Sequence, residues 1–164
     1  MTLSEIIEGE EKTTLSFHDY IQVIPENGFR YTGDILEKIS ESETNEDAGL
    51  LETLLSIASH DGLNKDYSRV LIHLLSQRWH HSHEDIAMML EEIKDPSSVD
   101  ALYKRALDIP DYDDGRSMVK KCIWALVSIN TDESWEKIKA IKEELNDPIV
   151  DSVINPYIDK KSRL

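Results

Sequence analysis

The chain has 164 residues, enough for one domain with its own hydrophobic core, and its 6 glycines and 5 prolines exclude a collagen-like or proline-rich polypeptide. Its 33 acidic and 18 basic side chains give a formal net charge of −15, and its single cysteine, Cys122, excludes an internal disulfide framework. No apolar run approaches the roughly 20 residues that span a bilayer, and the acidic N-terminus is the opposite of a secretory signal's basic start. We therefore expect a cytoplasmic protein that contacts no membrane.

The first 44 residues predict a helical cap with a partly disordered start. Residues 1–14 are polar and acidic, and we expect them to fray or to form one weak turn. Ser16 is placed to cap a helix that runs to Ile24, where Pro25 stops it, and Pro25–Gly28 is a predicted turn. Thr32 begins a second short helix that reaches Ile39, and residues 41–47 are expected to form a charged loop.

From residue 45 onward, apolar residues recur at helical spacing. A Lys65–Trp79 helix is predicted among them, and Asp61-Gly62 ends the run before it. The predicted helix N-caps are Asn45, Ser82, Asp95, Thr131 and Asp147. Pro follows Asp95 and Asp147 at the first helical position, where its missing N–H costs nothing. Asn155-Pro156 is expected to kink or end the last helix, which leaves residues 159–164 as a loose tail.

Two of the predicted helix pairs superimpose with a constant offset of 36 residues. The aligned pairs are Leu90 with Leu126, Ile93 with Ile129, Asp95 with Thr131, Val99 with Trp135, and Leu102 with Ile138. Each unit is a helix, a tight turn with a capping residue, and a second helix. A single pair cannot bury both of its faces, so such pairs are expected to stack into a solenoid.

Three short motifs carry a family resemblance. They are Ile-Ala-x-x-Leu from Ile86 to Leu90, Ile-x-Asp-Pro from Ile93 to Pro96, and Val-x-x-Leu from Val99 to Leu102. With these motifs the run His83–Leu107 resembles a HEAT repeat of the short bacterial type, and Lys120–Ile138 resembles it less faithfully. The resemblance implies an all-α fold, a right-handed α-solenoid of HEAT-like helix pairs over residues 45–158 with a non-repeat N-terminal helical cap over residues 1–44. Such motifs specify the fold well and the function hardly at all.

The acidic residues are concentrated in the first part of the chain. Residues 1–60 hold 13 acidic and 3 basic side chains, whereas residues 117–164 hold 8 of each. An acidic surface repels phosphate, so binding to nucleic acid or to an anionic membrane is disfavoured. It attracts a basic protein and steers the encounter with it. The alternative is that the charge only keeps the protein soluble.

An acidic loop interrupts the repeat and is a candidate partner-binding site. Its residues are Asp108, Asp111, Tyr112, Asp113 and Asp114. A large amphipathic side chain among carboxylates is the composition of an anchor with a clamp for a Lys- or Arg-rich partner. A calcium loop is a rival interpretation, although the later bidentate Glu is missing. A merely solvated loop is the third.

A second candidate surface follows from how solenoids bind, along the groove lined by the second helix of each pair. On the predicted Lys65–Trp79 helix, the polar stripe consists of Asp66, Arg69, His73 and Gln77. The equivalent positions on the later second helices are Asp100 and Lys104, then Glu136 and Lys139.

Aromatic and imidazole side chains follow this stripe in the turn Trp79-His80-His81-Ser82-His83-Glu84, and Trp79, His80 and His81 are further partner-binding candidates. Three histidines and an acid could hold zinc, but their spacing does not fit a helical HExxH site. A structural or surface role is the favoured interpretation, and a pH-sensitive contact is the other alternative.

The sequence shows no catalytic constellation, so we predict a protein that is not an enzyme and needs no cofactor or metal. Cys122 has no adjacent base and is expected to be a buried structural thiol. Neither a glycine-rich phosphate loop nor a GxSxG elbow occurs. An enzyme or ligand-binding solenoid would need a closed pocket, for which Trp79, Trp124 and Tyr112 are the available aromatic residues.

These features favour a non-catalytic protein-binding module. The most concrete version is an immunity protein that binds and occludes a basic cognate toxin domain, for example of the nuclease type, as a monomer within a heterodimer. The first alternative is a general HEAT-repeat adaptor or chaperone subunit. A ligand-binding or lyase-type solenoid and a DNA-mimicking inhibitor are the others.

Overall fold

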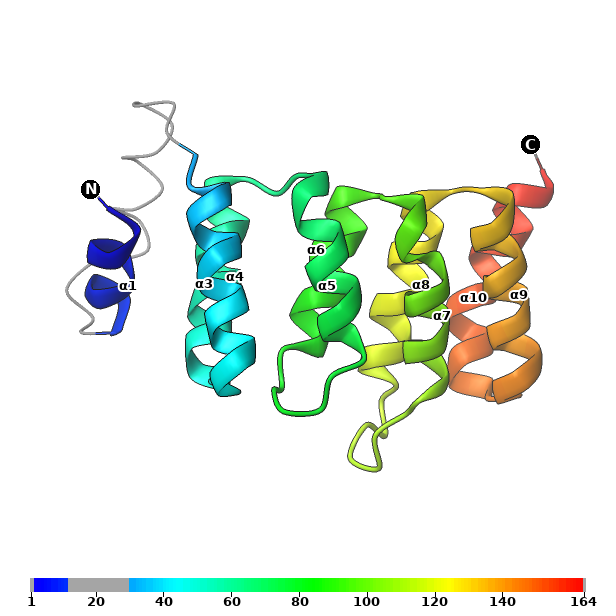
Figure 1. Cartoon of the computed structure of the whole chain (residues 1–164). Helices are drawn as coiled ribbons and strands as arrows, with labels where there is room; N and C mark the ends of the chain where they lie inside the picture. The colour runs from blue at the N-terminus through cyan, green and yellow to red at the C-terminus, as the bar shows by residue number, and fades with distance from the viewer. Residues whose placement is uncertain (1, 12–29, 164) are drawn as a thin grey trace. The chain divides into compact units, whose positions relative to one another are not determined.

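The computed structural model describes residues 2–11 and 30–163, and every regular element in these two ranges is helical (Figure 1). The predicted all-α class is therefore confirmed for this part of the chain. None of its helices is long and apolar enough to cross a membrane. The predicted Ser16–Ile24 helix and the Pro25–Gly28 turn lie outside the described residues.

The chain divides into an N-terminal unit, Met1–Tyr67 with Arg78–Ser82, and a C-terminal unit, Ser68–Gln77 with His83–Leu164.

The N-terminal unit is built on the helix pair α3 (Thr32–Asn45) and α4 (Ala48–Asp61), with α1 (Leu3–Glu11) packed on α4 and the short helix η1 (Lys65–Tyr67) following. Among the residues of this unit that the structure describes, the buried apolar side chains are Leu3, Ile6, Tyr31, Ile35, Ile39, Leu51, Leu54, Leu55, Ile57, Ala58 and Tyr67. Asp61 is also buried, and its Oδ2 accepts the Tyr31 N–H at 2.9 Å, which ties the end of α4 to the start of α3. Burial raises the pKa of this carboxyl.

Helix α1 is longer than the fraying segment or weak turn that we expected. The Thr2 and Glu5 side chains each accept the other residue's backbone N–H, at 3.2 and 2.7 Å, and this capping box starts the helix. Leu3 and Ile6 are then buried, at 6% and 1% exposure. Mutual capping and an apolar face together outweigh the acidic composition of the segment.

The predicted loop over residues 41–47 is also wrong, because α3 continues to Asn45. Ser42 is buried and its Oγ donates to the Ile39 carbonyl at 2.7 Å, so the polar residue is satisfied within the helix. The helix ends at Glu46, which is left-handed with φ 48°. Asp47 therefore caps α4 in place of the expected Asn45, and its side chain accepts the Leu50 N–H at 3.0 Å.

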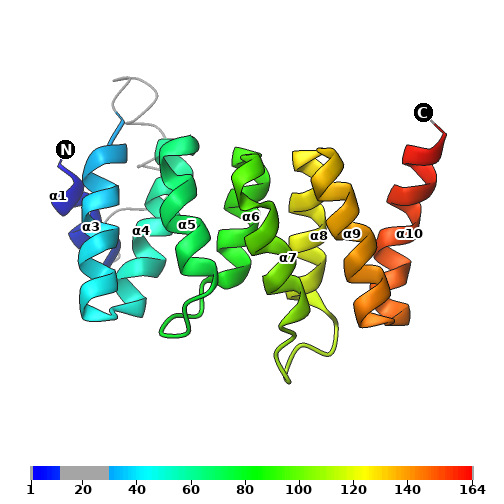
Figure 2. The same cartoon turned by 45° about the vertical axis from the view of Figure 1, so that its right-hand side comes forward.

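The C-terminal unit contains six α-helices in its described residues. They are α5 (Ser68–Leu75), α6 (His83–Ile93), α7 (Val99–Leu107), α8 (Ser117–Ile129), α9 (Asp132–Leu145) and α10 (Pro148–Ser162), and the short helix η2 (Pro96–Ser98) precedes α7. Helices α5, α7 and α9 pack in sequence along one side, and α6, α8 and α10 pack along the other (Figures 1 and 2). The core between the two rows is largely aliphatic.

Four short turns share one construction, a left-handed residue followed by a capping side chain. Glu46, Lys94, Asn130 and Asn146 have φ values of 48°, 57°, 55° and 44°. The capping residues that follow them are Asp47, Asp95, Thr131 and Asp147, and each accepts a backbone N–H in the first turn of the next helix. The predicted caps Asp95, Thr131 and Asp147 are thereby confirmed, with Ser134 completing a capping box.

Two helix ends differ from the prediction. Helix α5 ends at Leu75 rather than Trp79, because the Ser76 and Gln77 N–H groups turn back to the carbonyls of His73 and Leu74. Helix α10 passes through Pro156 and ends at Ser162, so residues 159–162, which we expected in a loose tail, are helical. The Lys161 ammonium lies 4.5 Å from the centroid of the Trp135 ring and holds this last turn on α9.

Replacing Lys94 with Asn should stabilise the protein. Lys94 is exposed and left-handed, a conformation that is unfavourable for lysine and tolerated by asparagine. We expect the free energy of unfolding to rise by about 1 kcal/mol. The measurement is the urea midpoint by circular dichroism. Lys139→Asn, in the middle of α9, is the control and should lower the midpoint; a Lys94→Asn midpoint at or below wild type would contradict the strain argument.

Candidate partner-binding surface

The loop between α7 and α8 is anchored by Asp113. This side chain is buried, at 7% exposure, and its two carboxylate oxygens accept the N–H groups of Ser117 at 2.7 Å and Met118 at 3.0 Å. It therefore caps the start of α8, where backbone N–H groups need acceptors. Of the four aspartates predicted as a clamp, Asp113 has its carboxylate directed into the protein.

Arg116 fixes the other side of the same loop. Its Nη1 donates to the carbonyls of Asp113 at 2.8 Å and Asp114 at 3.4 Å, and its Nε donates to Asp147 Oδ2 at 2.7 Å. Because Asp147 is the N-cap of α10, the loop is tied to a second helix start. The Arg116 guanidinium and the Ile149 N–H hold the pKa of the Asp147 carboxyl below its ordinary value.

The α7–α8 loop, held by Asp113 and Arg116, exposes three side chains at the surface. Tyr112 is 84% exposed, the most exposed large hydrophobic residue among those described, and Asp111 and Asp114 flank it with exposed carboxylates. Asp108, where the loop begins, pairs with Arg105 on α7 at 3.2 Å. An exposed aromatic ring on a backbone that is already held by hydrogen bonds loses little conformational freedom when a partner covers it.

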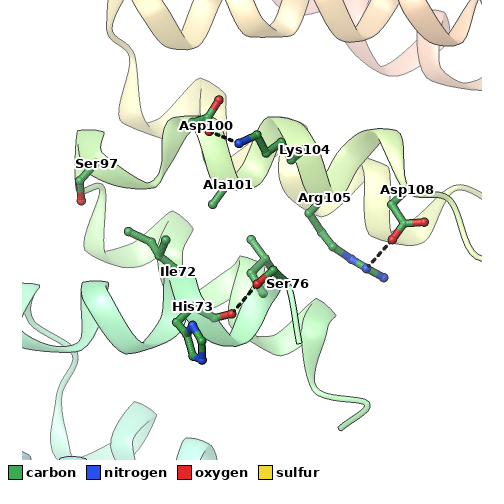
Figure 3. A pocket seen from close by; sticks show the side chains of 10 residues that line it. Ile72, His73, Ser76, Ser97, Asp100, Ala101, Lys104, Arg105 and Asp108 are labelled. Atoms are coloured by element: carbon green, nitrogen blue, oxygen red, sulfur yellow. Dashed lines mark hydrogen bonds and ion pairs between the residues drawn. The ribbon is translucent and has the colours of Figure 1, made fainter. Parts of the chain in front are cut away.

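A groove of about 450 Å³ lies between α5 and α7, both in the C-terminal unit (Figure 3). Ile72 points from α5 toward α7, and Ala101 points back from α7, while the Ser76 hydroxyl, just after α5, donates to the His73 carbonyl (Figure 3). The complete lining is Ile72, His73, Leu75, Ser76, Ser97, Asp100, Ala101, Lys104, Arg105 and Asp108. Asp108 belongs both to this lining and to the acidic loop, so the groove and the loop are continuous.

The predicted polar stripe is only partly brought together. His73 lies at this groove with Asp100 and Lys104, the positions predicted as equivalents on the next second helix. Arg69 is exposed on α5, while Gln77 lies beyond the helix and its carbonyl is 2.6 Å from His83 Nε2. Asp66 belongs to η1 in the N-terminal unit.

The aromatic and histidine turn has one buried member, His80, among its three partner-binding candidates. His80 is 1% exposed, its Nδ1 accepts the Ser82 N–H at 3.0 Å, and its ring meets Trp79 edge-on at a centroid distance of 5.0 Å. His81 is exposed and Trp79 is half-buried. No group of three or more His, Cys, Asp or Glu side chains that could hold a metal ion occurs in residues 2–11 and 30–163.

Cys122 is buried in α8, as predicted. Burial raises the pKa of its thiol to about 12, so the reactive thiolate is scarce at neutral pH. Neither Trp124 nor Tyr112, proposed above for a ligand pocket, lines the α5/α7 groove.

Sequence reasoning missed the apolar residues of the groove, Ile72, Leu75 and Ala101. One signal was available, because the α5 sequence SRVLIHLL is apolar on more than one face and therefore has more than one neighbour to contact. The roles of Asp113 and Arg116 left no comparable signal, since they depend on the fold of the loop.

Replacing Arg116 with Gln should loosen the loop and raise the pKa of Asp147. The carboxyl pKa is depressed in the folded protein, so its contribution to stability is present above the ordinary carboxyl value and is lost as the pH falls through the folded value. We expect Arg116→Gln to be less stable than wild type at pH 7 and the difference to shrink in acid.

Carboxyl ¹³C NMR titration and hydrogen exchange of residues 109–115 measure the two effects, and Arg69→Gln on the exposed face of α5 is the matched control. An unchanged Asp147 titration in Arg116→Gln would show that the ion pair does not form in solution.

No protein-family model, curated protein or solved structure matches this chain. The HEAT-repeat resemblance and the predicted binding function therefore stay predictions.

Proposed function

We propose that this protein is a non-catalytic binding module that neutralises a basic protein partner. The observation that supports this most directly is the exposure of Tyr112 on a loop whose backbone is fixed by Asp113 and Arg116. Tyrosine is one of the residues that most often dominates binding energy at interfaces. The flanking carboxylates of Asp111 and Asp114 complement a Lys- or Arg-rich surface.

The distribution of charge supports a basic partner. The N-terminal unit carries 15 acidic and 5 basic side chains, a net charge of −10. On α3, Asp34, Glu37 and Glu41 are all exposed and lie on one face at helical spacing. Such a field accelerates the approach of a cationic protein and weakens as salt is added.

The most concrete form of this proposal is an immunity protein that occludes a cognate toxin domain. In this form the chain is a HEAT-like α-solenoid and a monomer within a heterodimer, and it works in the cytoplasm. The acidic surface and the pre-formed loop need only cover the toxin's functional surface, because neutralisation by occlusion involves no chemistry. A general adaptor would use the same features with several weaker partners.

Affinity capture from the source cells at low and high salt should yield one dominant basic protein. We expect Tyr112→Ala and the double variant Asp111→Asn/Asp114→Asn to reduce its capture at least tenfold, because they remove the anchor and the clamp. Asp85→Asn/Glu92→Gln makes the same charge change on exposed positions of α6 and should have no effect. Capture of several unrelated partners would favour the adaptor. If the loop variants captured as much partner as wild type, the proposal would be contradicted.

The immunity form is tested by growth. Expression of the captured protein's toxic domain alone should arrest growth, and co-expression of this chain should restore it, while Tyr112→Ala should restore it poorly. Failure of the partner to arrest growth, or of wild type to relieve the arrest, would reject this form.

A further inference from the structure

We infer that the α5/α7 groove seats a large apolar side chain of the partner, next to a Lys or Arg cluster that the acidic loop binds. This inference rests on the proposed function and adds the kind of segment that is recognised. It commits to one occupant, a partner segment in which an apolar anchor and a group of cations lie close together.

The groove exists because one position on α7 carries a small residue. Ala101 faces α5 and leaves the space open (Figure 3). The position 36 residues later is Lys137 on α9, which reaches back to α7, where its Nζ lies 4.3 Å from the Tyr103 ring centroid and 3.8 Å from Asp100 Oδ1. A hydrogen bond from Tyr103 to Glu144 also crosses this junction. The α7/α9 junction is thus spanned by long side chains, whereas the α5/α7 junction retains about 450 Å³.

The chemistry of the groove suits an apolar side chain better than a small polar ligand. Its lining includes the apolar side chains of Ile72, Leu75 and Ala101. The charged side chains of the α7 part of the lining are paired, Asp100 with Lys104 at 2.8 Å and Arg105 with Asp108, just after the helix, at 3.2 Å. A small polar ligand would have to break these pairs to gain its own contacts, while an aliphatic side chain needs only the apolar surface.

The charges give the groove a direction. At one end, Asp100 is held by Lys104 and Lys137, and these ammonium groups lower its carboxyl pKa. At the other end, Asp108 opens the loop that carries the exposed carboxylates of Asp111 and Asp114. A partner segment seated in the groove therefore meets its complementary charge beyond the C-terminal end of α7, which fixes the cations on that side of the anchor.

Three synthetic peptides test this inference without knowledge of the partner. The parent peptide carries two leucines followed by four Lys or Arg residues, the second has serine in place of leucine, and the third has glutamate in place of the cations. Fluorescence anisotropy at low salt gives their affinities. We expect the leucine peptide to bind wild type at least tenfold more tightly than the serine peptide, and the glutamate peptide to bind most weakly.

Variants then show which residues provide the apolar contact and which provide the charge contact. Ala101→Phe fills the groove and should abolish the difference between the leucine and serine peptides. Ala140→Phe, on α9 and outside the groove lining, should keep the difference. Asp111→Asn/Asp114→Asn should weaken both basic peptides. Circular dichroism and urea midpoints establish that each variant is folded.

The outcomes separate the two proposals. Equal affinities of the leucine and serine peptides for wild type, or a difference that survives in Ala101→Phe, would overturn the groove inference and leave the loop in place. Affinities that do not respond to Asp111→Asn/Asp114→Asn would overturn the binding role of the loop itself. If neither basic peptide binds at millimolar concentration, the inferred recognition of such a segment is wrong.

Discussion

The fold depends on how each helix start obtains acceptors for its free backbone N–H groups. In four turns a left-handed residue ends one helix and a capping side chain opens the next, so that two residues suffice to reverse the chain. The connection from α7 to α8 solves the same problem with more residues. Arg116 is left-handed, with φ 60°, directly before α8, and the Asp113 carboxylate reaches from three residues earlier to cap it. The longer connection thus caps the next helix in the opposite order, with the capping side chain before the left-handed residue, and it exposes Asp111, Tyr112 and Asp114 at the surface.

The negative charge of the chain has two separate uses. Asp47, Asp95, Asp113 and Asp147 accept backbone N–H groups at helix starts, where the helix dipole favours a carboxylate. Other acids, such as those on the exposed face of α3, make no comparable contribution to a cap. A net charge of −15 therefore overstates the charge that is free to meet a partner. In the proposed binding role, only the exposed carboxylates would contact a partner, and those of Asp111 and Asp114 lie where Asp113 fixes the loop.

Local signals allowed much of the C-terminal unit to be predicted. Asp-Pro and the Thr131 cap act within a few residues of the chain, and the helices that they open are present. The two wrong predictions in the N-terminal unit, for α1 and for residues 41–47, also concern local features. There the charged composition indicated a loop, although the residues form helix. Thr2 and Glu5 form a capping box, and residues 41–45, with no glycine or proline, continue a helix once Ser42 is buried. Composition alone is a weak guide where a few polar residues satisfy one another.

The candidate site was predictable in position and not in detail. The acidic loop stood out because it interrupts the repeat, but its aspartates look alike in the sequence, and only the fold distinguishes the buried Asp113 from the exposed Asp111 and Asp114. The groove was not predictable, because it depends on which residues of α5 and α7 face each other, and on an alanine where α9 carries a lysine. Such contacts between helices are set by tertiary packing.

The anchored loop also bears on how such a protein can change over generations. Asp113 and Arg116 hold the loop at its base, while Asp111, Tyr112 and Asp114 carry exposed side chains outside the hydrophobic core. Substitutions at these three positions would alter the proposed partner-binding surface at little cost to folding. A lineage could therefore diverge quickly in partner choice while its helical body stayed the same, and related chains with closely similar cores could be strictly selective for different targets.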